Sequence, residues 1–167
     1  MLLFFNILRG CVQYPKLRRR YFEVVTFSVQ MAPSTIVKLP PTLFSAMMQT
    51  LEYGLGEEAV ESTQKAGCLQ ALYDLARYVY EQQRCGGSGA TGTAAMLAAD
   101  GQHSQALLHF LRILFDKLLF GDLGAELVDW AADLALALIL CYEQMFSSVR
   151  RFQPSTLSSL PTGIKCC

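Results

Sequence analysis

Residues 40–84, PPTLFSAMMQTLEYGLGEEAVESTQKAGCLQALYDLARYVYEQQR, predict a short helix, a turn and a long helix. Two prolines open the stretch, and apolar residues then recur at i, i+3 and i+4 over 41–53, which is the spacing of an amphipathic helix. Gly54 and Gly56 are expected to end this first helix. The acidic residues that follow are expected to begin a long helix over 57–84, because the helix dipole favours carboxylates in a first turn.

The same order of helix, turn and longer helix recurs on both sides of this stretch. Helical spacing is found at 2–12 and 16–31 before it, and at 103–119 and 125–149 after it. The second helices begin about 42 residues apart and then about 48 apart once a glycine-rich insertion is left out, close to the ~40–47 residues of HEAT and armadillo repeats. We therefore expect an all-α fold, an α-solenoid of about three HEAT-like helix pairs. A single antiparallel bundle is the alternative.

This interpretation divides the chain into four parts. Residues 1–84 hold two helix-pair repeats, 85–101 form a glycine-rich flexible insertion, 102–151 hold a third repeat, and 152–167 form a disordered tail. In the third repeat we expect Leu111 to be buried against the last helix. The inward side of that last helix is expected to comprise Leu127, Trp130, Ala131, Leu134, Leu138 and Met145.

Composition argues against several classes of function. The 14 basic and 14 acidic residues balance, so no global field draws the chain to nucleic acid or to a membrane surface. The six cysteines lack C-x-x-C spacing and only two histidines are present, so neither a metal site nor a disulfide framework is expected. The glycine run at 86–92 follows a helix and lacks the lysine of a phosphate-binding loop. We expect no catalytic residue, no cofactor and no membrane span.

The balance of residue types also bears on the ends of the fold. The apolar fraction is 52% and the charged fraction only 17%, against about 45–50% and 25% in ordinary domains. This composition suits a slice of a solenoid whose two ends meet further protein.

Carboxylates form the candidate partner-binding surface. The residues are Glu57, Glu61, Asp122, Glu126, Asp129 and Asp133. On the last long helix the final four fall within about 60° of one another at 100° per residue, and the first two make a smaller group on the preceding long helix. Such a line of charge suits a basic partner. A solvated face that the helix dipole favours is the alternative.

Other polar groups are given simpler interpretations. His109 and Asp116 could serve acid–base chemistry, but no nucleophile accompanies them, so we expect a polar face that meets solvent or a neighbouring repeat. Lys16 and Arg18–Arg20 form a basic cluster without interleaved aromatic residues, so a solvated face or contact with an acidic partner is expected instead of nucleic-acid binding. The terminal Cys166–Cys167 pair resembles a prenylated end, but the chain lacks the phosphate loop of small GTPases.

An ordered series of residues resembles a known superfamily. Within 21–56 the matching positions are Tyr21, Val25, Thr26, Phe27, Pro33, Leu39, Pro40, Leu43, Phe44, Leu51, Glu52 and Gly54. The series continues with Cys68, Leu69, Ala71, Leu72, His109, Phe110, Leu111, Phe115, Asp116, Ala131, Ala132, Ala135 and Cys141. Together they resemble the C-terminal region of nuclear export receptors of the importin-β (karyopherin) superfamily. The insertion and the tail depart from that pattern.

The resemblance implies a function that the residues alone do not. Members of this superfamily bind the GTP-bound form of the Ran GTPase together with protein cargo, which includes a hypusine-bearing translation factor. They pass phenylalanine–glycine (FG) nucleoporins and shuttle between nucleus and cytoplasm. The resemblance implies that this chain is a C-terminal part of such a receptor, with its second helices on the concave surface. A helical-repeat adaptor or scaffold unrelated to transport is the alternative function.

Overall fold

A computed structural model describes residues 14–57, 60–85, 102–120 and 123–152, and every regular element in these ranges is a helix. The helices are α2 (Pro15–Met31), α3 (Pro33–Ile36), α4 (Pro41–Gly56), α5 (Ser62–Cys85), α7 (Gln102–Phe120) and α8 (Ala125–Phe152). The all-α prediction is therefore confirmed for the described residues. The expected helix at 2–12, nearly all of the glycine-rich insertion and the tail after Phe152 lie outside them.

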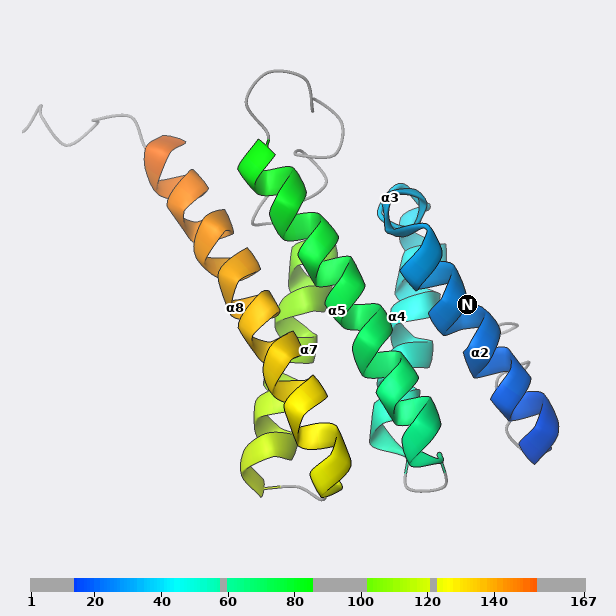
Figure 1. Cartoon of the computed structure of the whole chain (residues 1–167). Coiled ribbons are helices and arrows are strands. Elements are labelled where there is room, and N and C mark those ends of the chain that lie inside the picture. Colours follow the sequence, from blue (N-terminus) through cyan, green and yellow to red (C-terminus); the bar gives the residue numbers. More distant parts are fainter. Residues whose placement is uncertain (1–13, 58–59, 86–101, 121–122, 153–167) are drawn as a thin grey trace, which may run out of the picture.

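The longer helices lie in two layers (Figure 1). One layer holds α2, α5 and α8, which run side by side in the same direction. The other layer holds α4 and α7, which run in the opposite direction. Helix α5 contacts α2 on one side, α8 on the other and α4 behind it. The short helix α3 lies between α2 and α4 in the sequence.

Helix α5 is the centre of the core because its buried residues span almost half of its circumference. The apolar ones are Cys68, Leu69, Ala71, Leu72, Leu75, Ala76 and Val79. At 100° per residue these positions spread over about 160°, which is wide enough to meet three neighbouring helices. The small side chains among them let those neighbours approach closely, and each buried leucine contributes about 1.5–3 kcal/mol.

Gly54 lies where three helices meet. Of the two glycines that were expected to end helix α4, Gly56 is its last residue, whereas Gly54 lies within it. A Cβ atom on Gly54 would lie 2.7 Å from the Cys68 Sγ of α5 and 2.7 Å from Cε1 of Phe22 in α2. The glycine is therefore required by packing, not by the end of the helix.

The connection between α4 and α5 is longer than predicted, and α5 begins at Ser62 instead of at Glu57. The Glu57 backbone N–H donates to the Tyr53 carbonyl at 3.1 Å and completes α4. The first bonds of α5 are accepted by the Glu61 carbonyl. Between them Val60 is only 3% exposed. Glu57 and Glu61 therefore lie outside α5, and burial of Val60 holds this part of the connection against the core.

The third pair of helices packs largely as predicted. Leu111 and Leu138 are 9% and 2% exposed, so their expected burial is confirmed. Trp130 was predicted to face inward, but it is 43% exposed. It lies about 80° around the helix from Leu138, at the margin of the buried side, where a large indole reaches solvent. The side chain of Met145 is outside the described residues.

Two thiols are buried in the core. Cys68 packs beside Gly54, and Cys141 of α8 donates to the Ala76 carbonyl of α5 at 3.0 Å. Burial raises the pKa of each thiol from 9.0 to about 12. Both thiols are therefore neutral at physiological pH, and Cys141 links α8 to α5.

We predict that Gly54→Ala destabilises the protein by about 1–3 kcal/mol, because the added methyl group overpacks a three-helix contact. Gly56→Ala is the matched control, since a Cβ there meets no atom within 4 Å. It should be neutral or stabilising by up to ~1 kcal/mol, as for glycine replaced in a helix. Urea unfolding followed by circular dichroism measures both, and equal effects would contradict the packing role of Gly54.

We also predict that stability falls between about pH 9 and pH 12. The thiols ionise near 9.0 when unfolded and near 12 when folded, so their contribution is complete below pH 9 and is lost as the unfolded chain ionises first. Urea midpoints at pH 7.5, 9.0 and 10.5 should fall more steeply for the parent than for a Cys68→Ala/Cys141→Ala variant. Parallel pH profiles would show that the two thiols play no part.

Candidate partner-binding surface

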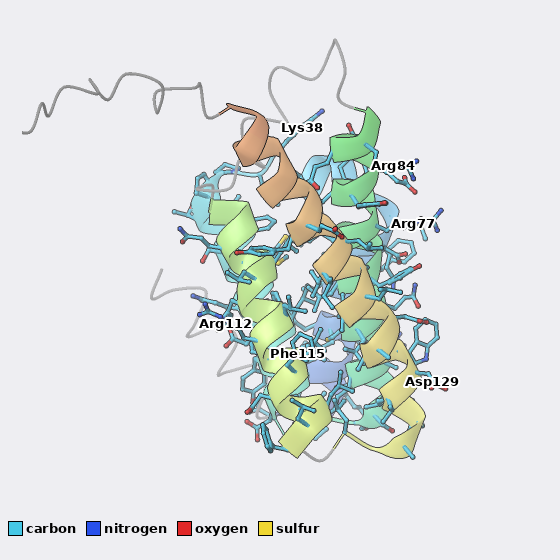
Figure 2. The ribbon with its side chains drawn as sticks, turned by 90° about the vertical axis from the view of Figure 1, so that its left-hand side faces the viewer. Lys38, Arg77, Arg84, Arg112, Phe115 and Asp129 are labelled. Carbon is cyan, nitrogen blue, oxygen red and sulfur yellow. The ribbon has the colours of Figure 1, made fainter. Side chains whose placement is uncertain are left out.

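Packing of α8 against α5 and α7 fixes which of its side chains reach solvent. Its buried line comprises Leu127, Ala131, Leu134, Ala135, Leu138 and Cys141. Glu126, Asp129 and Asp133 lie off that line and are all exposed. We call these three residues the acidic surface. In Figure 2, Asp129 points away from the helices on the same side as Arg77 and Arg84 of α5.

No basic side chain among the described residues neutralises the acidic surface. The ion pairs found there join Arg19 and Arg20 to Glu23, Arg77 to Glu81, and His109 to Glu52. Helix α8 itself carries no lysine or arginine before Arg150. Glu126 lies in the first turn of α8, where the helix dipole favours it. The exposure of the three carboxylates and the lack of a basic partner among the described residues leave a negative potential open to solvent.

The other predicted carboxylates lie elsewhere. Glu57 and Glu61 were expected on the long helix over 57–84. Because α5 begins only at Ser62, both residues lie before it. The end of α4 and the starts of α5 and α8 lie at the same end of the molecule (Figure 1). Burial, followed by the charge of the adjacent Glu57 carboxylate, raises the pKa of Tyr53. Asp122 is outside the described residues.

A groove between α5 and α8 was not foreseen from the sequence. It has a volume of about 250 Å³ and is lined by Tyr73, Arg77, Tyr80, Glu81, Arg84, Ala137 and Leu140. A pattern in the sequence could have indicated it, since Y-[DE]-x-x-R occurs at 73–77 and again at 80–84. Residues seven apart share one side of a helix. Tyrosine and arginine therefore alternate along the wall of α5.

The charges in this groove are largely satisfied within α5. Arg77 Nε donates to the Glu81 carboxylate at 2.9 Å, and that contact raises the pKa of Arg77. The Arg84 guanidinium lies 5.7 Å from the centre of the Tyr80 ring, within the range of a cation–π contact. Both arginines are exposed, so these contacts orient the side chains and contribute little stability.

A second groove lies between α4 and α7. Its volume is about 290 Å³, and Phe44, Met48 and Phe110 provide an apolar floor. At its rim His109 Nε2 lies 3.0 Å from Glu52 Oε1. His109 was expected to meet solvent or a neighbouring repeat, and its side chain is 54% exposed and contacts Glu52 of α4. Glu52 is 57 positions away in sequence, so spacing could not reveal the pair.

The basic cluster on α2 is partly neutralised by its own helix. Arg19 Nε and Arg20 Nη1 contact the Glu23 carboxylate at 3.0 Å and 2.8 Å. Hydrogen bonds from Arg19 and then from Arg20 lower the pKa of Glu23. All three side chains are largely exposed. This arrangement fits the predicted solvated face.

Neither a metal site nor a membrane-spanning helix is found among the described residues. Within that part of the chain, no group of three or more histidine, cysteine or acidic side chains is arranged to hold a metal ion. None of the helices described is both long enough and apolar enough to cross a bilayer. The exposed features of these residues include the acidic surface and the grooves between α5 and α8 and between α4 and α7.

No family model matches the sequence, and no solved structure matches the chain. The function is therefore argued from the residues and their arrangement.

We predict that Asp129→Lys/Asp133→Lys changes the free energy of unfolding by no more than about 0.5 kcal/mol per substitution, as for ordinary surface positions. Neither carboxylate has an ion pair to lose. Chemical denaturation at low and moderate salt gives the measurement. A loss above ~2 kcal/mol would mean that these carboxylates hold the fold and are not free for a partner.

Proposed function

We propose that this chain is part of a nuclear export receptor of the importin-β superfamily and that the acidic surface binds a basic protein partner. Within that superfamily the sequence resembles the C-terminal region of exportin-4. The observation that carries the proposal is the line of exposed, unneutralised carboxylates on α8, formed by Glu126, Asp129 and Asp133. Complementary charge speeds encounter and selects partners.

The arrangement of the helices supports a repeat protein. Helices α2, α5 and α8 are parallel neighbours in one layer, with α4 and α7 behind them (Figure 1). Stacked HEAT-like pairs produce this order, because the second helix of each pair lies beside the second helix of the next. In solenoids of this superfamily the second helices line the concave surface. By this interpretation the acidic surface faces inward, towards a bound partner.

Each partner of the proposed receptor has a distinct chemical requirement. Ran in its GTP form and protein cargo would meet the concave layer, where the acidic surface suits basic patches. FG nucleoporins would need a place for a phenylalanine ring, and the α4/α7 groove offers one beside Phe44, Met48 and Phe110. The proposed receptor binds neither nucleic acid nor membrane and performs no catalysis of its own.

Coupling between two partners would follow from the contacts between neighbouring pairs. The bond from Cys141 to the Ala76 carbonyl joins α8 to α5, and the His109–Glu52 contact joins α7 to α4. In a solenoid, stability is a sum of such nearest-neighbour terms. Two ligands that favour the same curvature therefore strengthen one another, and this coupling is reciprocal.

We predict that Asp129→Lys/Asp133→Lys weakens the binding of GTP-locked Ran, with or without cargo, by about tenfold, which corresponds to ~1.4 kcal/mol. Asp116→Lys is the control, since Asp116 is equally exposed but lies on α7 in the other layer. Fluorescence anisotropy with labelled Ran in its GTP and GDP forms measures the affinities.

Three outcomes are distinguishable. Selective loss in the Asp129→Lys/Asp133→Lys variant supports the proposal, and equal loss in the control assigns the effect to overall charge. If basic proteins bind irrespective of the nucleotide on Ran, the adaptor or scaffold function is favoured instead.

A further inference from the structure

The free side of α2 carries an apolar line that no described residue covers. Leu17, Val24 and Met31 follow one another at intervals of seven and are 50%, 64% and 66% exposed. Thr26 faces α5, because a Cβ on Gly67 would lie 3.8 Å from its side chain. At 100° per residue the three apolar residues lie about 140–180° from Thr26. They therefore point away from α5 and from the core.

The opposite end of the molecule has a matching apolar surface. Val128 and Ile139 of α8 are exposed and lie about 160–180° from Ala137, which lines the groove towards α5. Phe115 of α7 is exposed and lies about 180° from Ala106, which faces α4. These three residues define the α7–α8 end. Figure 2 looks onto this end of the molecule, with Phe115 labelled.

The order of the helices in the layer places these two apolar surfaces on opposite sides of the molecule. Helices α2, α5 and α8 run parallel, and each buries apolar residues against the next. A second copy placed beside α8 in the same orientation would bring its α2 to the next place in that layer. Its apolar line would then lie against the α7–α8 end. The packing between two molecules would then continue the packing of parallel helices that is already present within one molecule.

Charge fixes the orientation of such a contact. The N-terminal half of α2 holds Lys16 and Arg18–Arg20 with a single acid, Glu23. The N-terminal half of α8 holds Glu126, Asp129 and Asp133 and no base. Both N-termini lie at the same end of the molecule (Figure 1). Parallel stacking therefore brings the basic half of one helix near the acidic half of the other, whereas antiparallel stacking would not.

We propose that the apolar side of α2 binds the α7–α8 end of a second copy of this chain, so that the protein associates head to tail. The contact is heterologous: each molecule uses two different surfaces, and both remain available at the ends of a dimer. Such contacts build open chains unless the rotation between copies closes a ring. This inference does not depend on Ran or on cargo.

Sedimentation velocity of the full chain over a wide concentration range tests the proposal. The parent should grow from the 18.5 kDa monomer through dimers to larger species. Val24→Glu blocks one surface and Phe115→Glu blocks the other, so each variant alone should remain a monomer. Thr63→Glu adds the same charge on the exposed face of α5 and should associate like the parent.

Mixing the two blocked variants gives the decisive result. Each retains the surface that the other lacks, so an equimolar mixture should form a species of twice the monomer mass and no larger one. Because Phe115 is partly buried, Leu119→Glu, at a more exposed neighbouring position, replaces it if circular dichroism shows that Phe115→Glu unfolds.

Two results would overturn the proposal. One is a parent that stays monomeric at every concentration reached. The other is association that only one of the two surfaces controls, with no complementation in the mixture, because that pattern indicates a symmetric dimer through a single face.

Discussion

The fold depends on the burial of α5 between two parallel neighbours. Its leucines supply apolar area, while Cys68, Ala71 and Ala76 keep the distance between helices short. Gly54 must lack a side chain for α2 and α5 to meet over α4. Once α5 is enclosed in this way, α2 and α8 are held on either side of it. The exposed sides of those two helices, which carry the proposed binding surfaces, are set by the same contact.

Local patterns predicted most of the helices because apolar periodicity is a property of each segment alone. The predicted helices at 16–31 and 103–119 differ by one residue at most at each end from α2 and α7. The predictions that were wrong concern features that depend on contacts between helices. The function of Gly54 depends on Phe22 and Cys68 in two other helices. Burial of Val60 lengthens the connection before α5, and Trp130 reaches solvent at the margin of a packed face.

The candidate site was predictable to the same degree. The exposure of Glu126, Asp129 and Asp133 follows from the period of α8 alone, and the structure places them as the spacing indicates. Grooves are different, because each is formed by helices distant in sequence. The repeated Y-[DE]-x-x-R pattern marks the α5 wall of the α5/α8 groove. Nothing in that pattern identifies Ala137 and Leu140 of α8 as the opposite wall.

In the part of the chain that the structure describes, α2 and α8 are the outermost helices of their layer, and each carries exposed apolar residues on its free side. The acidic surface lies beside the apolar residues of α8. If both proposals hold, a basic partner and a second copy of the chain bind the same carboxylates, chiefly Glu126 and Asp129. Binding of one would then reduce the affinity for the other, since linkage between sites is reciprocal. Self-association would thereby keep the acidic surface covered until a partner with higher affinity displaces the neighbouring copy.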